Sequence, residues 1–207
     1  MKGTSHILTG GSTAVALDTY LRVITDITDI DIYNNVHEYF AWYRHLGIAD
    51  PATQSVVTVL AVILNCALFV IGCLLPEIDQ ERSLLGRIIH LPVKHRTWTH
   101  TIWAVGIFAA ISFFLPCIVY LVYGYTLHIF FDSLSKGGIC WFYPLSQYKT
   151  WTSGAQVKKN HKFYLYRTGE TSEAVLTTLI VLVGVCALIY NILLTAGVTL
   201  DLSFHAK

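Results

Sequence analysis

Long apolar segments separated by polar stretches dominate the chain. Residues 56–75 form an uncharged apolar run, and residues 174–196 form a second one of similar length. About 20 apolar residues in a helix cross the hydrocarbon core of a bilayer. The pattern therefore predicts transmembrane helices near 56–75 and 174–196.

A longer apolar segment covers residues 101–134 and contains Pro116 near its middle. A single helix of this length would measure about 51 Å at 1.5 Å per residue, far more than the thickness of the hydrocarbon core. Proline ends or kinks a helix. We therefore expect two helices, near 101–115 and 117–134, that meet at Leu115 and Pro116.

The first segment, residues 6–24, is less apolar because it contains Asp18, Arg22 and a pair of adjacent glycines. It either spans the membrane with its polar face turned into the bundle or lies in the interface, and we favour a span. The sequence thus predicts an all-α, multi-span membrane protein with four or five transmembrane helices. Residues 1–207 are expected to form a single integral membrane domain.

Composition supports this interpretation and limits the partners. The chain is 54% hydrophobic and only 13% charged, whereas soluble domains average roughly 25% charged residues. No cationic stripe with interleaved aromatic residues occurs in the sequence, so nucleic acid is not an expected partner. The expected surroundings are the lipid bilayer.

The charge distribution predicts the orientation. With five spans, the N-terminus, residues 76–100 and residues 135–173 face one side, whereas the acidic loop 25–55 faces the other. The first side holds 11 of the 14 lysine and arginine residues, which are Lys2, Arg82, Arg87, Lys94, Arg96, Lys136, Lys149, Lys158, Lys159, Lys162 and Arg167. Because cytoplasmic loops carry the excess of basic residues, this side is predicted to be cytoplasmic.

Seven ionisable side chains gather at the segment ends on this same side. They are His6, Glu77, Asp79, His95, His100, His128 and Asp132. Ionisable groups next to hydrocarbon are costly, and a membrane protein that keeps several at one depth usually has a use for them. Imidazole and carboxylate groups are also the ligands of zinc-type sites. We therefore expect a metal site at the cytoplasmic ends of the helices.

Local spacing gives each motif a specific interpretation and an alternative. His128 and Asp132 are four residues apart, so on a helix they lie on the same face. Both could be metal ligands, or Asp132 could orient His128 as the ligand. The alternative is a hydrogen-bonded pair without a metal. His95 and His100 flank a loop-to-helix junction that contains Arg96, which suits bidentate binding of a phosphate. The alternative is a basic stretch that binds anionic lipid headgroups.

The acidic pair and the first histidine are less specific. Pro76 ends the preceding helix, and Glu77 and Asp79 follow it two residues apart, where both could face one metal or bridge two. The alternative is an ordinary solvated acidic turn. His6 gains weight only because the predicted topology places it with the others.

Several short motifs follow one another along about residues 1–175. They are Ser5-His6-Ile7, Leu75-Pro76-Glu77-Ile78-Asp79 with Ser83, His95-Arg96-Thr97-Trp98-Thr99-His100-Thr101, Gly124-Tyr125-Thr126-Leu127-His128 with Asp132, Gly138 with Pro144, and Arg167-Thr168-Gly169-Glu170. In these motifs the chain resembles the YdjM-like membrane-bound metal-dependent hydrolases of the bacterial inner membrane. Four positions depart from the family pattern: Glu77 replaces an Asp, Gln80 a frequent His, Thr97 a Gly and Thr101 a Ser.

The resemblance implies a hydrolase with one or two divalent ions, with zinc expected from the ligand types and manganese or magnesium as alternatives. The implied metal ligands are His6, Asp79, His95, His100, His128 and Asp132. Glu77 and Arg96 are implied as catalytic residues, and Arg96, Lys94 and Arg167 as substrate-binding residues.

A more remote similarity to the zinc-dependent phospholipase C and single-strand nuclease group implies phosphoester hydrolysis. The membrane location suggests a lipid or polyprenyl-phosphate substrate. Two other functions remain open, namely a structural or sensory metal site and a small transporter. The clustering of ionisable residues at segment ends argues against the transporter, whose sites normally lie near the midplane.

Overall fold

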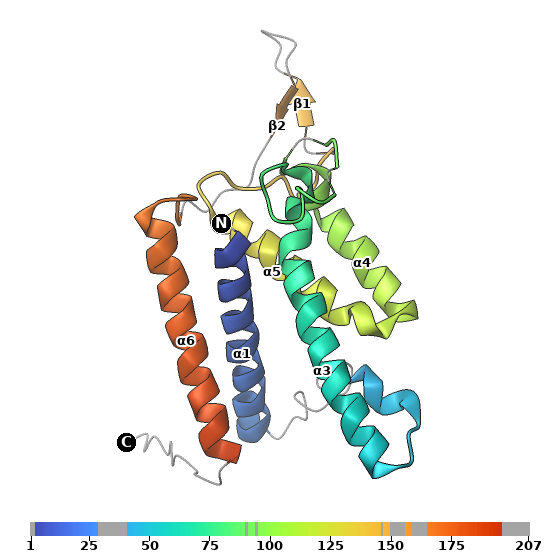
Figure 1. Ribbon diagram of the computed structural model, residues 1–207. Coiled ribbons are helices and arrows are strands. Elements are labelled where there is room, and N and C mark those ends of the chain that lie inside the picture. Colours follow the sequence, from blue (N-terminus) through green and yellow to red (C-terminus); the bar gives the residue numbers. More distant parts are fainter. Residues whose placement is uncertain are drawn as a thin grey trace, which may run out of the picture.

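The computed structural model describes residues 3–28, 41–89, 91–93, 95–145, 147–149, 156–158 and 165–195. Helices account for most of this part of the chain. A short antiparallel pair of strands, β1 (Gln147–Lys149) and β2 (Gln156–Lys158), projects from one end of the helices (Figure 1). The expectation of a helical membrane protein is confirmed at this level.

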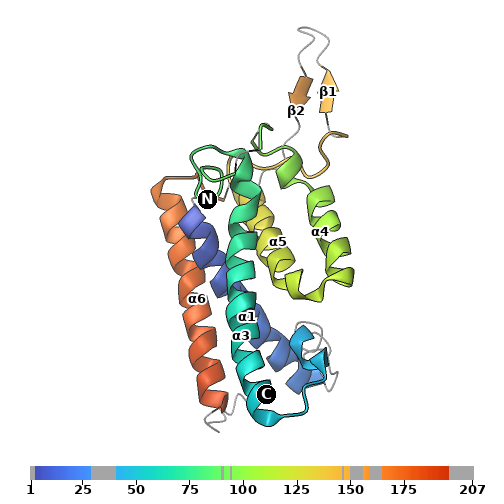
Figure 2. The ribbon, with the colours of Figure 1, turned by 45° about the vertical axis from the view of Figure 1, so that its right-hand side comes forward.

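Three long helices run side by side: α1 (Gly3–Thr28), α3 (Pro51–Leu74) and α6 (Thr171–Thr195), as Figures 1 and 2 show. Helices of this length measure about 36–39 Å at 1.5 Å per residue, enough to cross a hydrocarbon core of roughly 30 Å. The start of α3 is set locally, because the Asp50 carboxylate accepts a hydrogen bond from the Thr53 N–H at 2.8 Å and Pro51 occupies the first turn.

The segment with Pro116 is broken where the sequence predicts. Helix α4 (Ile102–Phe114) ends before Leu115, a 3₁₀ turn covers Pro116–Ile118, and α5 (Val119–Leu134) returns toward the starting end. The tip of this hairpin lies about midway along α3 in both Figure 1 and Figure 2.

The structure supports several membrane-spanning helices, and the number of spans stays a prediction. In the part of the chain that the structure describes, three helices are long and apolar enough to cross a membrane: Pro51–Asp79, Pro116–Leu134 and Thr171–Leu193. The segment predicted as a span at 101–115 forms the shorter apolar helix α4, whose 13 residues cover about 20 Å. Helix α1 covers all of the predicted segment 6–24 but is not among the three.

Small residues let the helices approach closely. A Cβ added at Gly72 would overlap the backbone of α5, and one added at Gly124 would overlap the backbone of α3. A Cβ at Gly184 of α6 would likewise collide with Ser12 of α1. Close backbone contact at small residues is a common mode of helix association in membranes, where the hydrophobic effect does not drive helices together.

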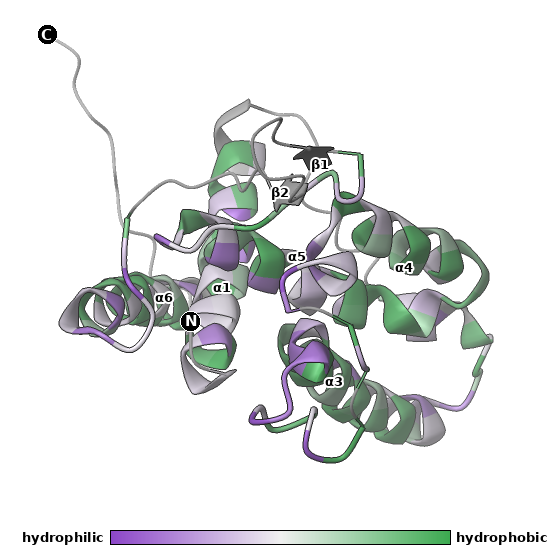
Figure 3. Ribbon diagram, turned by 90° about the horizontal axis from the view of Figure 1, so that it is seen from above, coloured by the Kyte–Doolittle hydropathy of each residue, from purple (hydrophilic) through white to green (hydrophobic). Residues whose placement is uncertain are grey.

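The polar face of α1 is turned toward α6. Arg22 donates a hydrogen bond to the Asn191 side-chain oxygen at 3.1 Å, and the Asn191 amide donates to the Thr19 hydroxyl at 2.6 Å. These contacts account for Arg22, one of the charged residues that make this segment less apolar. Helix α6 also exposes large apolar residues, such as Leu179, Leu182 and Val183. In Figure 3 much of its ribbon has the colour of hydrophobic residues.

Candidate metal centre

Four buried side chains from three parts of the chain converge on one point. His6 lies near the start of α1, His100 ends the 3₁₀ turn Trp98–His100, and His128 and Asp132 lie one turn apart on α5. The Nε2 atoms of His6, His100 and His128 lie 3.3, 3.6 and 3.9 Å from the Asp132 carboxylate oxygens. None of the four side chains is more than 3% exposed.

The histidine rings are held in defined orientations. Nδ1 of His128 lies 2.6 Å from the main-chain oxygen of Cys73 in α3. A carbonyl oxygen can only accept, so Nδ1 carries the proton and Nε2 of the neutral ring presents its lone pair toward Asp132. The His6 ring stacks on His128, with centroids 3.7 Å apart and an interplanar angle of 19°.

The geometry and the chemistry of these four groups fit a divalent cation. Among the described residues, Nε2 of His6, His100 and His128 has no hydrogen-bond partner, although such buried nitrogens are costly to leave unsatisfied. Tetrahedral ligands bound at about 2.0–2.1 Å lie roughly 3.3–3.4 Å apart, close to the spacings around Asp132. A cation among these groups would therefore pair with ring nitrogens that otherwise have no partner.

A second carboxylate supports the loop that carries the histidines. Asp79 ends the 3₁₀ turn Leu75–Asp79 and is 4% exposed. Its oxygens accept hydrogen bonds from His95 Nδ1 at 2.7 Å, from the Arg96 N–H at 3.1 Å and from the Thr99 hydroxyl at 2.5 Å. Asp79 therefore ties residues 95–99 to the end of α3.

Thr99 joins this carboxylate to the metal centre. Because its hydroxyl proton goes to Asp79, the oxygen is left to accept from Nδ1–H of His100, 2.9 Å away. Tyr125 of α5 donates to the Thr99 main-chain oxygen. Burial lowers the pKa of His100, but the nearby carboxylates of Asp132 and Asp79, each 3.6 Å away, raise it, and the net shift of the pKa is upward. The surroundings of His100 therefore favour positive charge.

Arg96 connects the two carboxylates. Its φ of +60° lies in the left-handed region, which is uncommon for residues other than glycine. In this conformation the main-chain N–H points at Asp79, while Nη2 of the guanidinium lies 3.1 Å from Asp132. Nη1 also donates to the Gly138 carbonyl at 3.2 Å. The side chain is therefore held against the metal centre and is 18% exposed.

Glu77 extends the cluster on its other side. This carboxylate is 8% exposed, and one of its oxygens lies with ring nitrogens of His6 and His128 in a group whose atoms are all within 4.8 Å of one another. A second such group contains His100, His128 and Asp132, and a third contains Asp79, His95 and His100. Since the groups share histidines, the cluster has ligand atoms for one ion or for two adjacent ions.

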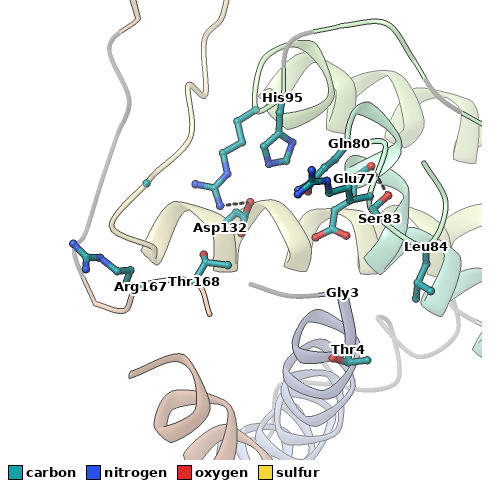
Figure 4. Close-up of a pocket in the computed structure, with 13 residues that line it drawn as sticks. Gly3, Thr4, Glu77, Gln80, Ser83, Leu84, His95, Asp132, Arg167 and Thr168 are labelled. Atoms are coloured by element: carbon teal, nitrogen blue, oxygen red, sulfur yellow. Dashed lines mark hydrogen bonds and ion pairs between the residues drawn. The ribbon is translucent and has the colours of Figure 1, made fainter. Parts of the chain in front are cut away.

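A cleft of about 590 Å³ opens onto the cluster (Figure 4). Glu77, His95 and Asp132 lie on its inner side, with Gly3 and Thr4 of α1 below them in the view. Three arginines also line the cleft: Arg82, Arg96 and Arg167. The exposed Arg167 forms an ion pair with Glu170 at 2.6 Å. The cleft thus brings cationic side chains next to the buried carboxylates and histidines.

The structure brings together seven of the predicted site residues, listed here by element: His6 from α1, Glu77 and Asp79 after α3, His95 and His100 before α4, and His128 and Asp132 from α5. Arg96 and Arg167 line the cleft beside them, whereas Lys94 lies outside the described residues. Sequence reasoning missed the roles of Thr99 and of the Cys73 carbonyl. The hydroxyl next to His100 was a usable signal, but nothing in a sequence marks one carbonyl among many.

Comparison with known proteins places the chain in a family. A family model described as YdjM inner membrane protein matches residues 1–196. Neither curated proteins nor solved structures give a significant match.

Proposed function

Because the chain belongs to the YdjM inner membrane protein family, we propose that it is a metal-dependent hydrolase that cleaves a phosphoester of a lipid at the membrane surface. The observation that carries this proposal is the convergence of three imidazole nitrogens and the Asp132 carboxylate beside a cleft lined by arginines. The first feature suits a divalent ion, and the second suits an anionic substrate.

His6, His100, His128 and Asp132 would hold the ion. Zinc is our first choice because imidazole nitrogens predominate, and manganese or magnesium are the alternatives. A divalent ion there supplies positive charge to a phosphoryl oxygen and lowers the pKa of water. Asp79 and Thr99 have a positioning role in this proposal, because they orient the His100 ring through hydrogen bonds.

The remaining cleft residues supply binding and proton transfer. Glu77 lines the cleft with its carboxylate near His6 and His128, so we assign it the acceptance of a proton from water. The Arg96 guanidinium, held by Asp132 and Gly138, would contact oxygens of the phosphoryl group. Arg167 and Arg82 at the cleft would attract the anionic headgroup.

We place the cleft on the cytoplasmic side. In this proposed topology α1, α3 and α6 cross the membrane. Helix α5 is long enough to cross, but α4 is not, so the hairpin they form enters and leaves on the cleft side. Replacing two short spans by one hairpin leaves every loop on the side that the charge distribution assigns. The basic residues of 76–100 and 135–173 therefore still face the cytoplasm under the positive-inside rule.

A structural or sensory metal site is the second candidate. It is favoured by the burial of all four potential ligands, since a closed site with four protein ligands is typical of structural zinc. The cleft argues for the catalytic alternative, because Glu77, His95 and Asp132 line it as well.

The test compares metal content and phosphate release in detergent-purified protein. The variants are wild type, His128→Ala, and His45→Ala as a control, because His45 lies in the turn Trp42–Leu46 at the opposite end of α3. We expect near-stoichiometric metal and phosphate release from phosphatidic acid in wild type and His45→Ala, and loss of both in His128→Ala. Metal without release from phosphatidic acid or polyprenyl phosphate would favour the structural or sensory site. Absence of metal after reconstitution with zinc, manganese and magnesium would overturn both.

A further inference from the structure

A second cavity, of about 360 Å³, lies between α1, α3 and α5 within the apolar part of the bundle. We propose that this groove binds one hydrocarbon tail of a phosphorylated lipid whose headgroup occupies the cleft. The inference rests on the proposed function, because it adds the tail-binding part of the same substrate site.

The groove begins next to the metal centre and leads away from it. Ile7, which lines the groove, directly follows His6. On α3 the lining residues Phe69 and Val70 come about one turn before Cys73, whose carbonyl orients His128. From there the lining continues along α3 to Val62, a length of about 12 Å at 1.5 Å per residue.

Polarity reverses between the two cavities. Three arginines line the cleft, whereas no lysine, arginine, aspartate or glutamate is among the residues that line the groove. The groove is formed mainly by aliphatic and aromatic side chains, with Asn65 tied to the Trp42 indole at 3.0 Å. A ligand that contacts both cavities therefore needs an anionic head and an apolar tail. A small soluble phosphoester would leave the groove empty.

Gly11 supplies a separate reason to regard the groove as a binding space. A Cβ added at the neighbouring Gly10 would lie 3.0 Å from the Cys73 sulfur, so close packing against α3 accounts for that glycine. A Cβ added at Gly11 would meet no atom within 4 Å, so packing within the protein does not require a glycine there. Because glycine is a poor helix former, its presence in the wall of the groove is best explained by the space it leaves for a ligand.

The test fills the groove from Gly11. Gly11→Leu places a side chain in the groove, and its Cβ meets no atom within 4 Å. Gly106→Leu is the matched control, because a Cβ at the exposed Gly106 of α4 also meets no atom within 4 Å. Both proteins are reconstituted into vesicles that contain phosphatidic acid with a diazirine in its tail, and crosslinked peptides are mapped after illumination. The expected result is crosslinking at residues 62–70 and 120–123 in wild type and Gly106→Leu.

Gly11→Leu should reduce this crosslinking about tenfold, which is the effect of losing roughly two buried methylenes. Cys66→Phe, which fills the groove from α3, should do the same and serves as the second variant if Gly11→Leu does not fold. Crosslinking that survives in both filled variants, or that falls equally in Gly106→Leu, would overturn the tail-binding role.

Crosslinking needs no turnover, so the two proposals fail separately. Tail crosslinking at the groove without phosphate release from any lipid would refute the hydrolase and leave the groove as a lipid site. Where release is observed, Gly11→Leu should lower kcat/KM for long-chain phosphatidic acid about tenfold and leave release from soluble glycerol phosphate unchanged. Equal loss on both substrates would contradict a tail site.

Discussion

The Thr99 hydroxyl offers a sensitive test of the proposed metal centre, because it contacts His100, a proposed ligand, without being a proposed ligand itself. Thr99→Val keeps the shape of the side chain and removes its hydroxyl. The buried Nδ1–H of His100 and the Asp79 carboxylate each lose a partner. Loss of one such outer hydrogen bond typically weakens metal affinity about 10–100-fold, or roughly 1.4–2.8 kcal/mol. The unpaired buried groups should also lower the free energy of unfolding by about 1–3 kcal/mol.

Zinc titration by calorimetry and thermal unfolding with and without zinc measure the two effects. At a zinc concentration about 100 times the wild-type Kd, zinc binding should stabilise the wild type by about 2.7 kcal/mol. A hundredfold weaker variant should gain only about 0.4 kcal/mol under the same conditions. Thr99→Ser retains the hydroxyl and should behave as the wild type. Wild-type zinc affinity in Thr99→Val, beside loss of binding in His128→Ala, would refute the orienting role of Thr99.

Three further predictions concern the scaffold. Gly124→Ala should push α5 away from α3 and lower the free energy of unfolding by about 1–3 kcal/mol. Gly106→Ala is the control, because a Cβ there meets open space and should leave the free energy of unfolding unchanged. Equal melting temperatures of the two variants would contradict the close crossing of α3 and α5. Asn191→Leu removes the hydrogen bonds that join α6 to Arg22 and Thr19, and it should lower the free energy of unfolding by about 0.6 kcal/mol per bond. An unchanged thermal unfolding curve would show that these bonds do not stabilise the protein. In the proposed topology the hairpin tip lies midway along α3, so Leu115→Cys should resist a membrane-impermeant thiol reagent added from the outer side of cells. Rapid labelling would favour the five-span topology instead.

Local rules in the sequence were enough for part of the fold. The break at Leu115 and Pro116 follows from proline chemistry, and the pairing of His128 with Asp132 follows from the helical repeat. The length of α4 could not be read in the same way. The apolar pattern of residues 101–115 is the same for a 13-residue helix and for a longer one, so the sequence did not show where the helix begins and ends.

The candidate site was predictable only as a neighbourhood. The topology placed His6 with residues from three other segments, and the structure does bring their side chains together. The path of the backbone decides which hydrogen-bonding groups orient each histidine ring. Arg96 in a left-handed conformation and the Cys73 carbonyl that contacts His128 are consequences of packing that no residue pattern records. The groove beside Gly11 likewise exists only because three helices meet there.

The position of Asp132 argues independently for a cation at this centre. It lies in the last turn of α5, which ends at Leu134, and the C-terminal end of a helix carries about half a negative charge. The C-terminal end of α3 adds a second negative end nearby, through the Cys73 carbonyl on His128. A buried carboxylate in such a place is unfavourable unless positive charge lies beside it. Arg96 provides one such charge on Oδ2 and reaches the centre from the cleft side. A divalent ion among the histidines would add further positive charge from within the bundle, on the side of Asp132 that faces His6, His100 and His128.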